Sequence, residues 1–147
     1  MSVRISGPPD GVRGARVDLV LLRRRALALL AALRHRGSEL SIALVDDATI
    51  RDLNRDWRGR DRATDVLSFS LLEGEGRAHR GSLLGDVIIS VETAAAQAAR
   101  RRRGLDDEVK RLLIHGLLHV LGHDHEDDDE ARVMQAEERR LSRLLGT

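Results

Sequence analysis

The sequence of 147 residues contains no cysteine. This absence excludes a disulfide framework, and it excludes the thiolate ligands that many structural zinc sites use. The sequence also lacks any apolar run that approaches the roughly 20 residues needed to cross a lipid bilayer. We therefore expect no membrane partner, and we expect any bound metal to be held by histidine or carboxylate groups.

A secretory signal peptide is missing as well. Residues 1–12 are polar and interrupted by Pro8 and Pro9, whereas a signal peptide needs an apolar segment. This start favours a cytoplasmic protein.

Lysine is nearly absent, because Lys110 is the only one. Arginine therefore carries almost all the positive charge of a chain whose formal net charge is +1. Arginine binds phosphate through paired hydrogen bonds that lysine cannot form, although a preference for arginine can also reflect the base composition of a genome.

The length and the hydrophobic content of 41% predict one compact domain over residues 1–147. Apolar patterns predict strands at residues 3–5, 40–45, 65–71 and 84–91. Helical spacing predicts a helix at residues 17–35 that ends at Gly37, a short helix capped by Asp46 or Asp47, and helices at residues 92–102, 112–121 and 128–145. Residues 55–62 and 73–82 are predicted to be connections. Strands that come early and helices that concentrate late predict an α+β fold, with a small mixed four-stranded sheet covered by helices.

The most informative stretch is the run from His115 to His125, which holds four of the six histidines. In a helix, His115 and His119 lie one turn apart, about 6 Å along the axis and on the same face. Gly122 can adopt the left-handed conformation that ends a helix, and the reversed chain can then bring His125 to the same point. The spacing therefore predicts one metal ion held by three imidazoles.

Three protein ligands leave the fourth position of a tetrahedral zinc open, which is typical of a catalytic site. Zinc lowers the pKa of a bound water to about 7 and polarises the bond under attack, so the pattern predicts hydrolysis with one Zn²⁺ per chain. The same spacing occurs in metzincin proteases, where a glutamate that follows the first histidine is the general base. Gly116 occupies that position here, which favours a substrate other than a peptide.

Two polar residues beside the predicted ligands have alternative roles. His123 is interpreted either as a hydrogen-bond partner of a ligand or as a solvent-facing turn residue. Asp124 either orients a ligating imidazole or supplies ordinary turn chemistry.

Arginines crowd a second stretch around Trp57, the only tryptophan. Arg58, Arg60 and Arg62 could contact backbone phosphates while a base stacks on Trp57. Alternating arginine and aspartate is also typical of a self-paired, solvated surface, and the residues alone leave the two interpretations open.

Two charge runs have simple local explanations. Residues 100–103 are basic and end a predicted helix, where cations complement the helix dipole, although a contact with RNA stays an alternative. Residues 126–130 are acidic and supply the cap and first turn of the last predicted helix.

Three motifs together resemble the YbeY family of endoribonucleases. They are Trp57-Arg58-Gly59 with residues 64–69 (TDVLSF), residues 84–90 (LGDVIIS), and residues 115–125 (HGLLHVLGHDH). The resemblance spans residues 53–125, about half of the chain. It implies a zincin-like metal-hydrolase fold, a metal held by three histidines, and cleavage of single-stranded RNA. It also implies a role in maturation of the 3′ end of 16S ribosomal RNA and in ribosome quality control.

Carried over by position, the resemblance places the metal ligands at His115, His119 and His125, with His115 also counted as catalytic. It places the functionally important arginine of the family at Arg58, and this favours RNA contacts for Trp57, Arg60 and Arg62 as well. Asp86, in the strand motif, is expected to support the metal shell or to position the strand. The implied partners are ribosomal RNA and ribosomal particles, with ribosomal proteins or assembly GTPases as further candidates.

The chain departs from the usual family pattern at three positions. His123 replaces an aromatic residue, and Ala63 and Ser70 replace prolines. The extra histidine leaves open which imidazole completes the metal shell. Two other functions are weighed against the nuclease: a zinc-stabilised ribosome-assembly factor that binds RNA without cleaving it, and a metalloprotease with a relocated base.

Overall fold

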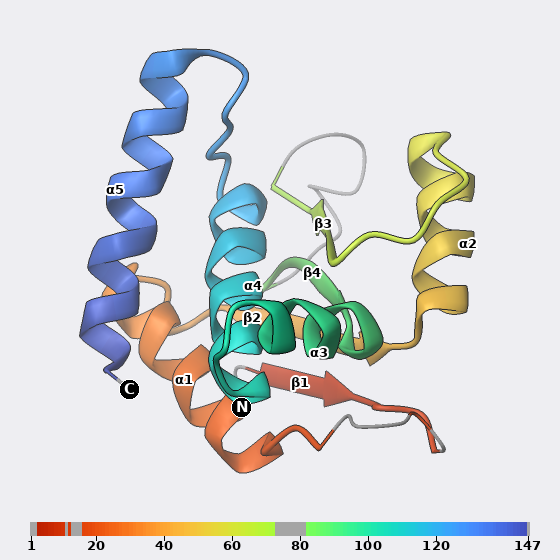
Figure 1. The fold of residues 1–147 in the computed structure, drawn as a ribbon. Helices are drawn as coiled ribbons and strands as arrows, with labels where there is room; N and C mark the ends of the chain where they lie inside the picture. The colour runs from red at the N-terminus through yellow and green to blue at the C-terminus, as the bar shows by residue number, and fades with distance from the viewer. Residues whose placement is uncertain (1–2, 11, 13–15, 73–81, 147) are drawn as a thin grey trace.

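The computed structural model describes residues 3–10, 12, 16–72 and 82–146 (Figure 1). The elements are, in chain order, β1 (Val3–Ser6), α1 (Leu19–Ala32), β2 (Glu39–Val45), α2 (Asp47–Arg58), β3 (Val66–Ser70), β4 (Leu83–Ser90), α3 (Val91–Arg100), α4 (Leu105–Val120) and α5 (Asp128–Leu145). Apart from Ser82, the predicted connection at residues 73–82 lies outside the described residues. No helix in the described ranges is long and apolar enough to span a membrane.

The four strands form one mixed sheet in the order β1-β2-β4-β3. β1 pairs with β2 and β2 pairs with β4 in parallel, whereas β3 runs antiparallel to β4. The predicted α+β fold with a mixed four-stranded sheet is therefore confirmed. β3 is an edge strand, so it pairs with β4 on one side only.

The two faces of the sheet are covered by different helices. Val87 and Ile89 of β4 belong to the larger core, which includes buried residues of α1, α4 and α5. Ile88 lies on the other face, where it forms a small cluster with Ile50 of α2 and Leu67 of β3. Figure 1 shows α5 alongside α4, and α2 on the far side of β3. The edge strand β3 therefore lies between α2 and α4.

The bounds of two helices differ from the predictions. α2 continues through Arg58 to the left-handed Gly59, so the prediction of a connection was wrong for residues 55–58. Its predicted start is confirmed, because the Asp46 side chain accepts a hydrogen bond from the Thr49 N–H. α1 ends at Ala32 rather than near Gly37, and Arg34 adopts the positive φ of 64° that a glycine was expected to supply.

The ends of α4 and the start of α5 frame the histidine run. α4 begins at Leu105, earlier than expected, with three acidic residues in its first turn. At its other end Gly122 has a φ of 98°, and the N–H groups of Gly122 and His123 donate to the carbonyls of His119 and Leu118. This is the Schellman pattern, so the predicted glycine stop is confirmed. The acidic run that follows caps α5 through Asp127, also as predicted.

Gly116 allows α4 to approach the sheet closely. A Cβ atom at Gly116 would lie 2.7 Å from Val87 Cγ1 and 3.1 Å from Ser68 Oγ. At the same contact, the hydroxyl groups of Ser68 and Ser70 donate to the carbonyls of Gly116 and Val120, at 2.9 and 2.8 Å. Two residues of a strand span nearly the same length as four residues of a helix, so both hydroxyls reach successive turns of α4.

We predict that Gly116→Ala lowers the free energy of unfolding by about 1–3 kcal/mol, because Val87 is fully buried and cannot move away from the added methyl group. This loss exceeds the gain of up to about 1 kcal/mol that alanine brings to a helix interior. Denaturant unfolding measures the difference. Gly37→Ala is the control, since a Cβ there meets no atom within 4 Å. A Gly116→Ala protein as stable as the parent would contradict the prediction.

Candidate metal centre

Three of the histidines of the run gather at the C-terminal end of α4. His115 and His119 come from successive turns of the helix, and His125 comes from the segment after the glycine stop. One ring nitrogen of each lies within 4.8 Å of the others, and the Nε2 atoms of His115 and His119 are 3.2 Å apart. Two ligands that share a tetrahedral zinc at 2.0–2.1 Å lie about 3.3 Å apart. The donor set and its spacing therefore fit one metal ion with three imidazole ligands.

The surroundings of His119 favour the neutral, metal-binding form of imidazole. Burial lowers the pKa of His119, and the neighbouring His115 and His125 lower it further. A lower pKa keeps a nitrogen lone pair available at neutral pH, as metal binding requires.

Glu138 of α5 completes the surroundings of the triad. Its Oε2 atom lies 3.4 Å from Nδ1 of His115, whose Nε2 faces His119. A carboxylate in this position holds a ligating ring in one tautomer and orientation. The sequence analysis missed Glu138, because it lies 23 positions from His115 in a helix with several glutamates and only the packing of α5 against α4 singles it out.

His123 and Asp124 lie at the rim of the same site. Both line the cleft beside the triad, but His123 is not part of the group of converging nitrogens. The geometry therefore makes His125, and not His123, the third histidine of the triad. The Asp124 carboxylate accepts a hydrogen bond from the His125 N–H at 2.7 Å, which is turn chemistry that also fixes the backbone of His125.

Arg58 reaches the triad from the other side of the sheet. It belongs to the last turn of α2, its guanidinium donates to the Ser68 carbonyl of the edge strand, and it lies 4.9 Å from the centre of the Phe69 ring. Arg58, His115 and His119 line one polar cleft of about 670 Å³, with Thr64, Asp65, Ser68 and Ser70 among its other walls. α2 and α4 thus contribute to one site across β3.

The arginine-rich stretch divides into two groups. Arg51 pairs with Asp61, and Arg55 pairs with Asp52 and Asp56, as expected of a self-paired surface. By contrast, Arg58, Arg60 and Arg62 form no salt bridge within the described ranges, and all three line a second, smaller pocket next to the cleft.

Trp57 stands beside these unpaired cations. Its side chain is 70% exposed, and its ring meets Phe69 edge to face with centroids 6.3 Å apart. Most of the indole surface is therefore open to a planar ligand.

Asp86 is not brought to the metal centre. Successive strand residues face opposite sides of a sheet, and its neighbours Gly85 and Val87 face α4. Asp86 therefore faces the α2 side with Ile88 and does not line the cleft. This position gives no support to the expected role of Asp86 in the metal shell, and that role and the positioning of the strand both stay predictions.

A buried charge network joins β3 to α4 one turn before the histidines. Glu108 is fully buried and accepts from Arg111, whose nearest guanidinium nitrogen is 2.6 Å away. Arg111 also donates to Gln97, and Gln97 donates to Asp65 at the start of β3. Glu108 raises the pKa of Arg111, so this residue stays charged. The network fixes Asp65 in the wall of the cleft.

Comparisons with known proteins agree with this geometry. The family described as "Endoribonuclease YbeY" matches residues 19–146. The chain belongs to the YbeY family. A YbeY relative from Anaeromyxobacter sp. (strain Fw109-5), named Endoribonuclease YbeY, is 52% identical over 99% of this chain and 73% of its own length. Another with the same name, from Syntrophus aciditrophicus, is 42% identical over 88% of this chain and 82% of its own length.

The fold is similar to a solved structure as well. The solution structure of TM1509 from Thermotoga maritima matches with a TM-score of 0.65 and 26% identity, over 97% of this chain and 88% of that chain. The YbeY resemblance predicted from the three motifs is therefore confirmed, and it extends well beyond residues 53–125.

We predict that Glu138→Gln weakens zinc binding about 10-fold to 100-fold, because the amide cannot hold the His115 ring as a carboxylate does. Competition with a chromophoric chelator measures the affinity. Glu137→Gln is the matched control on the same helix, since Glu137 pairs with Arg140 instead of a histidine. Equal affinities in the two variants would show that Glu138 does not position the ligand.

Proposed function

We propose that this chain is a metal-dependent endoribonuclease that cleaves single-stranded RNA. The observation that carries the proposal is that one cleft is lined by Arg58, which forms no salt bridge within the described residues, and by His115 and His119, two members of the triad that His125 completes. The triad is suited to a metal that activates water, and the arginine is suited to a phosphate. The name that these relatives carry, Endoribonuclease YbeY, supports this combination.

His115, His119 and His125 would hold one Zn²⁺. When bound, the metal would supply a Lewis acid and would lower the pKa of water at its open position. The protein supplies the rest of the chemistry: Glu138 orients His115, burial keeps His119 neutral, and Asp124 fixes the backbone of His125.

Arg58 would bind the scissile phosphate and offset the charge that develops on it. The guanidinium is held against the Ser68 carbonyl and the Phe69 ring, so it is oriented before substrate arrives. A preorganised charge of this kind stabilises a transition state more than a mobile side chain does.

Trp57, Arg60 and Arg62 would hold the strand next to the cleavage point. The exposed indole offers a surface on which a base stacks, and the two unpaired arginines offer contacts to neighbouring phosphates. A single strand suits this surface, because only an unpaired base can turn its face to a tryptophan.

The biological substrate follows from family membership rather than from geometry. We propose that the chain acts in the cytoplasm on ribosomal RNA within ribosomal particles, in maturation of the 3′ end of 16S RNA and in ribosome quality control. Ribosomal proteins or assembly GTPases are the partners that such a role implies.

The packing at Gly116 excludes a general base at the position that metzincin proteases use, so a peptidase reaction here would need a base from elsewhere in the chain. A glutamate at this position would act as the general base of a peptidase, but its Cβ would collide with the buried Val87. The close contact between α4 and the sheet therefore excludes the residue that the protease reaction needs at that position.

We predict that the purified protein binds about one equivalent of zinc and that His119→Ala loses it, because two imidazoles alone hold the ion weakly. Elemental analysis after dialysis measures the content. His35→Ala is the matched control, since this histidine follows α1 and is not part of the triad. Retention of zinc by the His119→Ala protein would contradict the ligand assignment.

We predict that Arg58→Ala lowers kcat/KM for single-stranded RNA by about 10²-fold to 10³-fold while the zinc content stays at the parent value. Arg55→Ala is the matched control from the same helical turn, because Arg55 is held by two aspartates. Cleavage of a labelled strand is followed on gels. If the parent binds RNA and leaves it intact with zinc bound, the chain is an assembly factor and the nuclease proposal fails.

A further inference from the structure

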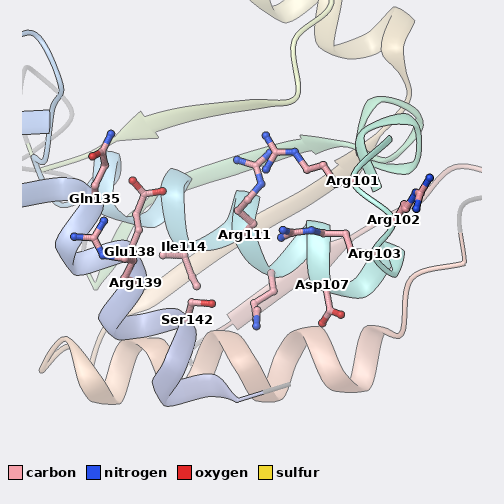
Figure 2. Close-up of a pocket in the computed structure, with 11 residues that line it drawn as sticks. Arg101, Arg102, Arg103, Asp107, Arg111, Ile114, Gln135, Glu138, Arg139 and Ser142 are labelled. Atoms are coloured by element: carbon pink, nitrogen blue, oxygen red, sulfur yellow. The ribbon is translucent and has the colours of Figure 1, made fainter. Parts of the chain in front are cut away.

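A second open cavity lies beside α4, on the side of the helix opposite to Gly116, which packs against the sheet. Its walls come from the turn between α3 and α4, from α4 itself and from α5, and it is lined mainly by Arg101, Arg102, Arg103, Lys110, Arg111 and Arg139. In Figure 2, Arg101 and Arg103 extend from the turn over α4, and Arg139 lies on α5. We call this cavity the basic groove.

The basic groove has few negative charges, and both are already engaged. Asp107 pairs with the buried Arg25 at 3.5 Å, and Glu138 contacts His115 of the triad. Six cationic residues therefore face two carboxylates that have other partners. The lining of the groove therefore has an excess of positive charge, although the net charge of the whole chain is only +1.

Four of the six cations, Lys110 and three arginines, form no salt bridge within the described residues. Arg103 and Arg111 share Glu108. Lys110 donates to the Gly146 carbonyl at the end of α5. By contrast, Arg101, Arg102 and Arg139 are exposed and form no salt bridge within the described part of the chain. Guanidinium groups in this state are free to bind an anion.

The walls of the basic groove and of the metal cleft contact each other through two side-chain pairs. His115 lines the cleft and contacts Glu138, which lines the groove. In the same way Asp65 lines the cleft and lies 4.0 Å from Arg111, which lines the groove. Arg111, His115 and His119 are spaced four residues apart, so they follow one face of α4 from the groove to the triad. His115 lies about 15 Å along the helix axis from Leu105, the first residue of α4, and the groove lies along this stretch.

We propose that the basic groove binds the phosphate backbone of the same RNA strand whose scissile phosphate lies in the metal cleft. This inference rests on the proposed function and extends the binding site beyond it. The groove is lined by cations and contains no aromatic side chain, so it suits phosphates rather than bases. The exposed Trp57 lies in α2, which contributes Arg58 to the cleft, whereas the groove is lined from α4, α5 and the turn before α4. The strand therefore runs from Trp57 past the triad and along α4.

The test compares Arg101→Ala/Arg139→Ala with the control Arg16→Ala/Arg24→Ala, whose arginines are exposed and lie outside every cavity named here. The probe is a labelled 2′-O-methyl oligouridylate long enough to span cleft and groove, and affinity for the zinc-loaded protein is measured against salt. Removing two contacts to a single strand lowers the slope of log K against log salt by about 1.4, which is about a 25-fold loss of affinity at 0.1 M salt. A trinucleotide, which cannot reach the groove from the cleft, serves as the second probe.

The inference requires a loss that is specific to the groove variant and to the long strand. Arg101→Lys/Arg139→Lys restores most of the affinity, because it keeps the two charges, and it separates lost contacts from misfolding. An unchanged slope, or an equal loss in the control pair, overturns the inference even if the parent cleaves RNA. If instead the parent cleaves no RNA but the groove variant still binds the long strand more weakly, the proposed function fails and the groove assignment stands.

Discussion

The close approach of α4 to the edge of the sheet is the constraint on which the site depends. It exists because Gly116 has no side chain and because the hydroxyls of Ser68 and Ser70 bind the carbonyls of two successive helical turns. The histidines at 115 and 119 lie on the same stretch of helix, so their distance from β3 is set by these contacts. A longer side chain at position 116 would move the imidazoles away from Ser68 and Ser70 of β3, and from the Arg58 guanidinium that Ser68 holds.

The edge position of β3 allows two layers of the fold to meet in one cleft. A central strand would separate α2 from α4, since they pack on opposite faces of the sheet. At the edge, Arg58 passes around the strand and is held by its Ser68 carbonyl. That carbonyl and the Ser68 hydroxyl, which binds Gly116, belong to the same residue. One strand residue therefore fixes both the arginine and the helix that carries the ligands.

Ser70 restrains the end of the edge strand through its side chain. Its hydroxyl donates to the Val120 carbonyl of α4 and accepts from the Leu72 N–H. A serine hydroxyl that bonds to nearby backbone groups competes with regular secondary structure. Ser70 therefore both ends β3 and joins it to the last turn of α4.

The sequence predicted features that depend on near neighbours. The histidine spacing on one helix and the glycine stop at Gly122 are local, and the structure contains both as expected. The features that were missed depend on packing between distant segments. Glu138 reaches His115 only because α5 lies against α4, and the face of Asp86 follows from the register of β4. The extent of α2 was misjudged because its last turn is polar and its apolar contacts lie earlier in the helix.

Charged residues are distributed unevenly around the metal centre, and this favours one path for a bound RNA strand over another. On one side of His123 and Asp124 lies a pocket lined by Glu126, Asp129 and Glu130. These carboxylates are crowded, since the charge of Asp127 raises the pKa of Glu130. A phosphate backbone is repelled there.

The opposite sides of the cleft carry the unpaired arginines of the α2 segment and of the basic groove. Although the net charge of the chain is nearly neutral, acidic residues gather on one side of the triad and unpaired arginines on the other. An RNA strand is therefore repelled from the acidic side and attracted to the arginines. Both favour the proposed path over α4, and neither needs a base-specific contact, which suits the proposed cleavage of single-stranded RNA.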